Sequence, residues 1–265
     1  MLKDPVIESA ELAGIGAYRF LDARESTVFA AAHAPGAVRV PIEAWVAAAK
    51  ADETSLDNVA HWEAVIAALG VDDDTLTVIY DDGRMTEAAR VWFILQYFGA
   101  KAVILNGGWA AMAESNIPSS VTAATSPPRR FHARAGSGSV GVVDREGVRT
   151  ELESGTKILD ARSNAEFDGE DLRRNSRGGH LPGARLLSHT SLLDGLRLRP
   201  ADELRSLLSD AGFHSGDHVV THCDGGARAA LAAVAAVRAG YTDVRAYYHS
   251  FADWARDESC PIVRD

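Results

Sequence analysis

The sequence predicts an α/β protein of two tandem domains, each a mainly parallel β-sheet covered by helices on both faces. Two observations lead to this prediction. A series of short motifs occurs twice, in the same order, along the 265 residues. Within each half, short β-branched runs alternate with longer helical segments, which is typical of parallel strands joined by crossover helices.

The repeat is clearest in four motifs of each half. The first half contains "YRFLDAREST", "HAPGA", "TVIYDDG" and "NGGWAAM", and the second contains "TKILDARSNAEF", "GHLPGA", "HVVTHCDGG" and "YYHSFADW". Several coincident motifs in one order indicate a duplicated domain. The anchor residues of the alignment pair as Asp22 with Asp160, His33 with His180, Asp81 with Cys223, and Trp109 with Trp254.

A segment of different composition lies between the two halves. The stretch "NIPSSVTAATSPPRRFHARAGSGS" is rich in proline, serine and glycine, which is typical of a linker. We place the boundary near Pro128, which gives domains 1–127 and 128–265, each close to the usual domain size.

Each half is expected to place a helix directly after a buried strand. "TLTVIY" and "DHVVTH" are short β-branched runs of the kind that a buried strand requires. "EAARVWFILQYFG" and "RAALAAVAAVRAG" predict the helices, and they end at Gly99 and Gly240, where a left-handed C-cap residue belongs. A further strand follows each glycine, "KAVIL" in the first half and "DVRAYY" in the second.

Composition excludes several classes of function. Apolar residues make up 46% and charged residues 24%, and the net charge of −10 lacks the basic footprint of a nucleic-acid-binding protein. No apolar run approaches the ~20 residues of a membrane span, and the N-terminus has no signal-peptide core. Two cysteines, Cys223 and Cys260, cannot form a disulfide framework, so we expect a reducing cytoplasm. Histidines and cysteines lack zinc-ligand spacing, so neither a metal nor another cofactor is expected.

The stretch "VVTHCDGGARAALAAV" carries the chemistry. Cys223 follows a predicted parallel strand, at the sheet edge where such folds build their sites. Gly225 and Gly226 let the backbone curl with its N–H groups inward, and a helix N-terminus adds partial positive charge behind them. Arg228 adds a full charge. We therefore expect a thiol at the rim of an anion cradle, with a lowered pKa. The alternative is a buried structural cysteine, which is common on core strands.

These residues resemble the tandem-domain rhodaneses, the thiosulfate and 3-mercaptopyruvate sulfurtransferases. The likeness covers nearly the whole chain and includes "LDAR" in both halves, "HAPGA", "GHLPGA", "CDGGAR" and "NGGWAAM". The resemblance implies that Cys223 attacks the sulfane sulfur of a donor, becomes a persulfide, and passes the sulfur to an acceptor. Such an acceptor is cyanide, a small thiol or a thioredoxin-like protein. The persulfide would be held by the backbone N–H groups of Asp224, Gly225, Gly226, Ala227 and Arg228.

The same resemblance implies that the first domain is non-catalytic. Its residue at the cysteine position is Asp81, and a carboxylate cannot carry a persulfide. We expect this half to form one wall of a cleft over Cys223. Phosphatases that share the fold have five residues between cysteine and arginine, whereas "CDGGAR" has four. The shorter loop favours a sulfur atom over a phosphate group.

Two positions depart from the family pattern, and they leave the donor open. Asp224 follows the cysteine where thiosulfate-specific members tend to carry basic residues, and Glu166 stands where donor-binding members often have arginine. Arg173 or Arg174 could supply the missing charge. We favour thiosulfate over 3-mercaptopyruvate because Arg228 keeps a cation at the loop. A catalytically quiet rhodanese-like module, which binds a partner or senses oxidants, is the alternative of another class.

Other polar residues have architectural interpretations. Asp160 and Arg162 of "LDAR" could brace the active loop, and their repetition in the first half favours an architectural role. His222 precedes the cysteine and points to the opposite face of its strand, so we expect a packed or bracing histidine. His180 is repeated as His33 and is expected to be structural. Cys260 is expected to be a plain thiol of the tail.

Overall fold

The computed structural model describes residues 4–115, 117–122, 124 and 127–264. The chain divides by its internal contacts into two units. The first comprises Met1–Gly138 and Gly195–Leu198, and the second comprises Ser139–Asp194 and Arg199–Asp265. The boundary lies after Gly138 rather than near Pro128, because the segment between these residues packs on the first unit. Phe131 in this segment is only 3% exposed, and the N–H of Arg134 donates to the carbonyl oxygen of Phe98.

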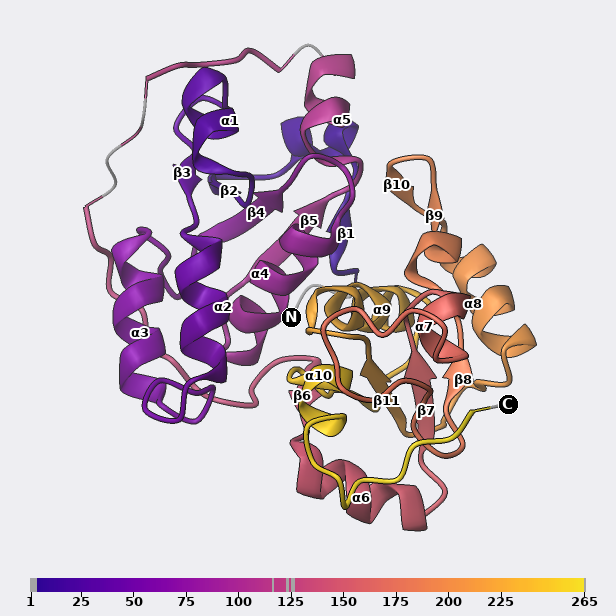
Figure 1. The fold of residues 1–265 in the computed structure, drawn as a ribbon. Helices are drawn as coiled ribbons and strands as arrows, with labels where there is room; N and C mark the ends of the chain where they lie inside the picture. The colour runs from indigo at the N-terminus through magenta and orange to yellow at the C-terminus, as the bar shows by residue number, and fades with distance from the viewer. Residues whose placement is uncertain (1–3, 116, 123, 125–126, 265) are drawn as a thin grey trace. The chain divides into compact units, whose positions relative to one another are not determined.

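The first unit is built around a five-stranded parallel sheet of order β1-β5-β4-β2-β3 (Figure 1). Helices α1, α2, α3, α4 and α5 surround the sheet and cover its faces. The elements in chain order are β1 Val6–Ile7, η1 Ser9–Gly14, β2 Tyr18–Asp22, α1 Ser26–Ala31, β3 Val38–Arg39, α2 Ile42–Lys50, α3 Val59–Ala68, β4 Leu76–Tyr80, α4 Thr86–Tyr97, β5 Ala102–Leu105 and α5 Gly108–Glu114.

The second unit repeats this plan with the order β6-β12-β11-β7-β8, again with parallel pairs. Each strand thus stands where its counterpart stands in the first unit, which confirms the duplication. The elements are β6 Val140–Val142, α6 Arg145–Glu153, β7 Lys157–Asp160, α7 Asn164–Phe167, β8 Arg185–Leu186, η2 His189–Leu192, β9 Leu193–Asp194, β10 Arg197–Leu198, α8 Ala201–Asp210, β11 Val219–His222, α9 Ala227–Arg238, β12 Val244–Ala246 and α10 Ser250–Trp254.

The predicted strand–helix pairs are present in both halves. β4 and β11 are the central strands of their sheets, and almost all their residues are buried. Helices α4 and α9 follow them and are succeeded by Gly99, with φ +90°, and by Gly240, with φ +97°. Both glycines therefore adopt the left-handed conformation that ends a helix without Cβ strain.

Residues Gly195–Leu198, which are the turn after β9 and the strand β10, belong to the first unit. There the amide of Asn106 accepts from the N–H of Leu198 at 2.7 Å and donates to its carbonyl at 3.2 Å. Arg197 forms ion pairs with Glu8 at 3.3 Å and with Glu114 at 2.6 Å. These polar contacts explain why residues far along the sequence belong to the first unit.

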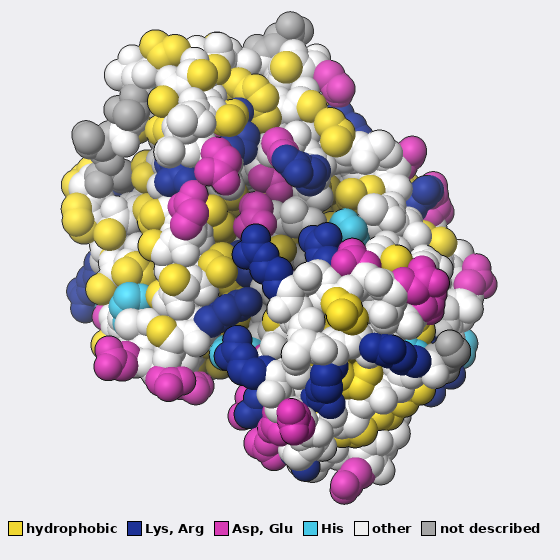
Figure 2. All heavy atoms as spheres, in the orientation of Figure 1, with side chains coloured by type: hydrophobic (Ala, Val, Ile, Leu, Met, Phe, Trp, Pro, Cys, Tyr) yellow, Lys and Arg dark blue, Asp and Glu magenta, His cyan; other side chains and the backbone are white. Residues whose placement is uncertain are grey.

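Two properties of the described residues bear on the function classes. No helix among them is both long and apolar enough to cross a membrane. Figure 2 shows Lys and Arg side chains lying among Asp and Glu side chains on the visible face, in keeping with a net charge of −10.

Candidate active site

Cys223 lies at the carboxyl end of the central strand of the second unit. β11 ends at His222 and α9 begins at Ala227, so Cys223–Gly226 forms a tight turn between strand and helix. β11 pairs in parallel with β7, with His222 opposite Asp160. This is the sheet edge at which parallel α/β folds place their sites.

The sulfur of Cys223 lies on the floor of the turn. The backbone N–H of Gly226 donates to Sγ over 3.0 Å. The Ser250 hydroxyl lies 3.8 Å from Sγ and accepts the backbone N–H of Cys223 at 3.1 Å. The residue is only 1% exposed. Polar groups nevertheless face the sulfur, which distinguishes it from a cysteine enclosed by hydrocarbon.

Gly226 gives the turn its shape. Its φ of +102° lies in the region that side-chain-bearing residues rarely adopt. It is the N-cap residue of α9 and has no side chain to cap the helix. The N–H of an N-cap position and those of the first helical turn have no partner within the helix. An anion at this point, such as a thiolate or persulfide, satisfies them.

Ser250 is a site residue that the sequence interpretation missed. It is fully buried, has φ +61°, and donates its hydroxyl to the carbonyl oxygen of Tyr247 at 2.8 Å. Its counterpart in the first half is Gly108, with φ +55°, in the motif "NGG". The glycine at this position in the first half could have pointed to Ser250, but pairing Trp109 with Trp254 put the two repeats out of register here.

That alignment paired Trp109 with Trp254, and the structure corrects it. The backbone N–H of Trp109 donates to the carbonyl oxygen of Asp81, and the backbone N–H of Phe251 donates to the carbonyl oxygen of Cys223. The guanidinium of Arg24 lies 4.2 Å from the Trp109 ring centroid, and that of Arg162 lies 4.0 Å from the Phe251 ring centroid. Trp109 is therefore the counterpart of Phe251, because the two make equivalent contacts. Trp254 occupies a core position three residues later.

The charge of Arg228 is paired with Glu166. The two terminal nitrogens of Arg228 lie 2.6 and 2.7 Å from the two carboxylate oxygens of Glu166. Ser163 donates to the same carboxylate from its N–H and its hydroxyl, at 3.1 and 2.9 Å. Burial alone would raise the pKa of Glu166, but hydrogen bonds from Arg228 and Ser163 outweigh it and bring the pKa to about 2. The same ion pair, outweighing burial, raises the pKa of Arg228.

The loop 168–179 contributes further contacts to the turn. Asn175 donates its side-chain N–H to Asp224 at 2.7 Å. Arg173 has its Nε 3.8 Å from Glu166, and its side chain is 54% exposed. Arg174 is exposed. The structure thus brings Arg228 and Arg173 to Glu166, and Asn175 to Asp224.

Asp160 and Arg162 brace the base of the site. Two nitrogens of Arg162 donate to the Asp160 carboxylate, the shortest contact being 2.6 Å, and both residues are buried. Asp22 and Arg24 form the same pair in the first unit, which supports the architectural interpretation. His222 is fully buried with its Nε2 3.3 Å from Asp160, and burial lowers its pKa. His222 is therefore packed in the core, and its Nε2 has no hydrogen-bond partner among the described residues.

The repeated histidines have the expected structural role. His33 stacks on Phe29 at 4.0 Å and bonds to its carbonyl oxygen, and His180 does the same with Phe167 at 3.7 Å. Cys260 differs from the expectation of a plain tail thiol. It is 0% exposed and belongs to a core cluster, and burial raises the pKa of its thiol.

The equivalent turn of the first unit holds a carboxylate instead of a sulfur. Asp81 accepts N–H groups of Gly83, Met85 and Ala88 at 2.8, 3.1 and 3.2 Å. Burial raises the pKa of Asp81 to about 6, against the lowering effect of these bonds. Asp81 therefore occupies its own amide cradle, in line with a non-catalytic first domain. Met85, with φ +63°, caps α4 in the place that Gly226 takes before α9.

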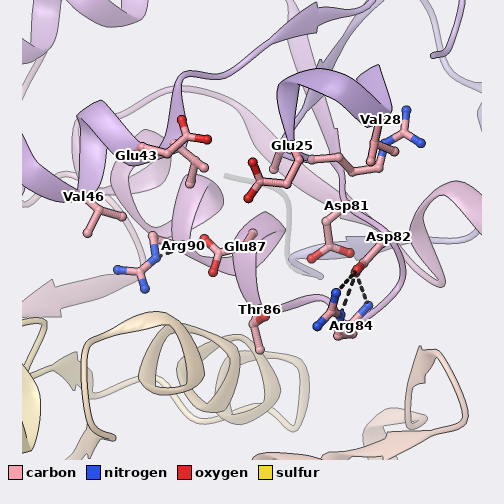
Figure 3. A pocket seen from close by; sticks show the side chains of 13 residues that line it. Glu25, Val28, Glu43, Val46, Asp81, Asp82, Arg84, Thr86, Glu87 and Arg90 are labelled. Carbon is pink, nitrogen blue, oxygen red and sulfur yellow. Dashed lines mark hydrogen bonds and ion pairs between the residues drawn. The ribbon is translucent and has the colours of Figure 1, made fainter. Parts of the chain in front are cut away.

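A cavity of about 490 Å³ opens beside this carboxylate. Figure 3 shows Glu25, Asp81 and Glu87 turned toward the same space, and Asp82 bonded to Arg84. No group of three histidine, cysteine or acidic residues suited to a metal ion occurs in the part of the chain that the structure describes.

Comparison with known proteins agrees with this arrangement. The sequence model of the rhodanese-like domain family matches the chain twice, over residues 8–115 and 144–257. The 3-mercaptopyruvate sulfurtransferase of Escherichia coli K12 is 29% identical, covering 87% of this chain and 83% of its own. The human 3-mercaptopyruvate sulfurtransferase is also 29% identical, covering 88% and 80%.

Solved structures agree as well. SseA, a 3-mercaptopyruvate sulfurtransferase from Escherichia coli, superposes with a TM-score of 0.77 at 26% identity, covering 94% of this chain and 99% of its own. EanB in complex with ergothioneine superposes with a TM-score of 0.86 at 18% identity, covering 98% of this chain and 70% of its own, which shows a common fold alone. The chain belongs to the rhodanese family and is a sulfurtransferase with two tandem rhodanese-like domains.

Proposed function

We propose that the chain moves a sulfane sulfur from thiosulfate or 3-mercaptopyruvate to a thiophilic acceptor through a persulfide on Cys223. The contact that carries the proposal is the 3.0 Å hydrogen bond from the Gly226 N–H to Sγ, at the N-terminus of a twelve-residue helix. A hydrogen bond and a helix dipole both favour a sulfur anion over a thiol. Relatives whose names include these two donors support the choice of substrates.

The reaction proceeds in two balanced steps. The Cys223 thiolate attacks the outer sulfur of thiosulfate, an S–S bond forms, and sulfite leaves with the electron pair of the broken bond. With 3-mercaptopyruvate, the C–S bond breaks and the pyruvate enolate leaves and takes a proton. An acceptor thiolate or cyanide then attacks the outer sulfur of the persulfide, and the Cys223 thiolate is the leaving group.

The turn would hold the persulfide through its backbone. In this proposal the N–H groups of Asp224, Gly225, Gly226, Ala227 and Arg228 surround the outer sulfur. Asp160 and Arg162 fix the neighbouring strand, and Arg173 and Arg174 offer charge to an anionic donor at the exposed side. No metal or cofactor takes part, and a cytoplasmic compartment would keep the thiol reduced.

Mass spectrometry of the intact protein tests the proposal. After incubation with thiosulfate or 3-mercaptopyruvate and removal of the excess, Cys223 should carry the mass of one additional sulfur atom. Cys223→Ser should carry none, whereas Cys260→Ser should be loaded like the wild type. The alternative of another class is a catalytically quiet rhodanese-like module. Absence of the added sulfur with both donors would support that module and contradict the enzyme.

A further inference from the structure

We infer that Glu166 is a specificity-determining residue of the Cys223 site, which disfavours doubly charged donors by cancelling the charge of Arg228. The inference rests on the proposed function and refines it by stating which donor charge the site accepts. Arg228, in the first turn of α9, is the cation that the sequence interpretation assigned to donor binding. In the structure, both terminal nitrogens of Arg228 donate to the carboxylate of Glu166.

The pair is fixed rather than transient. Glu166 is 3% exposed, Arg228 has a side-chain exposure of 16%, and the contacts are bidentate. Ser163 holds the carboxylate from the other side with two hydrogen bonds. Bidentate arginine–carboxylate pairs are geometrically specific, and a partly buried one is weakly screened by salt. A donor that approaches the turn therefore meets a neutral pair instead of a free guanidinium.

The remaining charges do not restore a strong positive field. Asp224 adds a negative charge within the turn, next to the sulfur anion. Arg173 contacts Glu166 at 3.8 Å but is more than half exposed. Burial, and after it the charge of Arg228, lowers the pKa of His189, so this imidazole takes up a proton less readily than a free one. A dianion such as thiosulfate is thus attracted less than it would be by an unpaired Arg228, and the difference scales with donor charge.

The variant Glu166→Gln removes the charge and keeps the shape of the side chain, but replaces one acceptor oxygen with a donor NH2 group. With one acceptor, kcat/KM is measured for thiosulfate, which carries two charges, and for 3-mercaptopyruvate, which carries one. The ratio of the thiosulfate value to the mercaptopyruvate value should rise about fivefold, since one unit of repulsion acts on two donor charges instead of one. Glu166→Asp, which keeps the charge, should leave the ratio within about twofold of the wild type.

Glu151→Gln is the matched control. Glu151 is also paired, with Arg245 at 2.9 Å and His218 at 3.1 Å, but these partners lie toward the start of β11 and β12, at the sheet edge opposite Cys223. This variant should leave the donor ratio unchanged. A purely structural role of Glu166 would lower both kcat/KM values by one factor, and an equal change for the two donors would overturn the inference.

A binding measurement separates this inference from the proposed function. In the Cys223→Ser background no persulfide can form, and adding Glu166→Gln should tighten thiosulfate binding, measured by calorimetry, at least about fivefold. Unchanged or weaker thiosulfate binding would contradict the inference, even if the wild-type enzyme transfers sulfur. If thiosulfate binding tightens but wild-type Cys223 never carries an added sulfur, the proposed function is contradicted instead.

A double variant covers the case in which Glu166→Gln fails to fold because Arg228 is left unpaired. Glu166→Gln combined with Arg228→Gln removes both charges together. If the wild-type pair presents no net charge to the donor, the donor ratio of the double variant stays within about twofold of the wild type. A fall in the ratio would show that Arg228 attracts the donor despite its partner, and would contradict the inference.

Discussion

The backbone N–H of Gly226 donates to the sulfur of Cys223, three residues earlier, over 3.0 Å. This contact joins the end of the central strand to the start of α9, because Gly226 is the helix N-cap residue. Gly226 has φ +102°, the left-handed conformation through which the chain passes from this donor into α9. The turn between β11 and α9 thus places a hydrogen-bond donor against the sulfur of Cys223.

Gly226→Ala should slow sulfur loading more than it destabilises the fold. A Cβ at positive φ costs about 1–2 kcal/mol or shifts the backbone, and loss of a donor to a reacting anion costs about 10²-fold in rate. Rapid-quench mass spectrometry measures the loading rate. Gly240→Ala, at φ +97° after α9, is the matched control, and it should lose similar stability but load at the wild-type rate. Equal loading by both variants would contradict the role of Gly226.

Ser250→Ala should destabilise the second domain and slow loading. The variant leaves the N–H of Cys223 and the carbonyl oxygen of Tyr247 without their hydroxyl partner, which costs about 1–3 kcal/mol. Ser250→Gly also loses the hydroxyl but relieves the left-handed backbone, so it should be about 1 kcal/mol more stable than Ser250→Ala. Native-state hydrogen exchange of peptide 244–254 measures the difference. An alanine variant as stable as the glycine variant would refute the assigned strain.

Local sequence signals predicted much of the fold. Gly99 and Gly240 end their helices in the predicted conformation because a left-handed C-cap depends on neighbouring residues only. The position of Cys223 after β11 followed from a β-branched run and a glycine pair in the same way. The late domain boundary was missed because Phe131 is a buried apolar residue in a stretch whose composition is that of a linker.

Partners of the active turn were harder to predict. Ser250 lies 27 residues from Cys223, Asn175 lies 49 residues from Asp224, and Glu166 lies 62 residues from Arg228. No periodicity or spacing rule connects residues so far apart, because their contact depends on how separate elements pack. Sequence reasoning therefore placed Cys223 at the end of its strand and Arg228 at the loop as a cation, but did not find that Glu166 pairs with Arg228.

Asp224→Asn should raise kcat/KM for thiosulfate about threefold, since it removes one negative charge beside the sulfur. The amide oxygen of asparagine can still accept the hydrogen bond from Asn175, so the loop stays in place. Steady-state kinetics with thiosulfate at low ionic strength gives the value. Asp210→Asn, an exposed charge before β11, should leave it unchanged. A decrease for Asp224→Asn would show that this carboxylate helps the reaction.

Asp160→Asn and Asp22→Asn should each destabilise their own domain. Each removes one partner of a buried arginine–carboxylate pair, and breaking such a pair costs about 3–5 kcal/mol. Hydrogen exchange of peptides 157–162 and 18–24 reports the two losses separately. If the pairs are architectural, folded Asp160→Asn protein should still load sulfur on Cys223 within about threefold of the wild-type rate. Failure to load by a folded protein would assign Asp160 a direct role.

Stability of the first domain should fall as pH rises through the titration of Asp81. Burial raises the pKa of Asp81 in the folded state to about 6, above its ordinary value of 3.8. Between these two values the folded state holds a proton that the unfolded chain has released. The contribution of Asp81 to the free energy of unfolding is therefore complete below the lower pKa and lost as pH rises through the higher one, a change of about 3 kcal/mol.

Hydrogen exchange of peptide 76–97 at pH 4 to 8, corrected for the intrinsic rate, should show this decline. Asp81→Asn cannot titrate and should remove the decline, and a wild-type profile parallel to that of the variant would show that Asp81 stays ionised in its cradle.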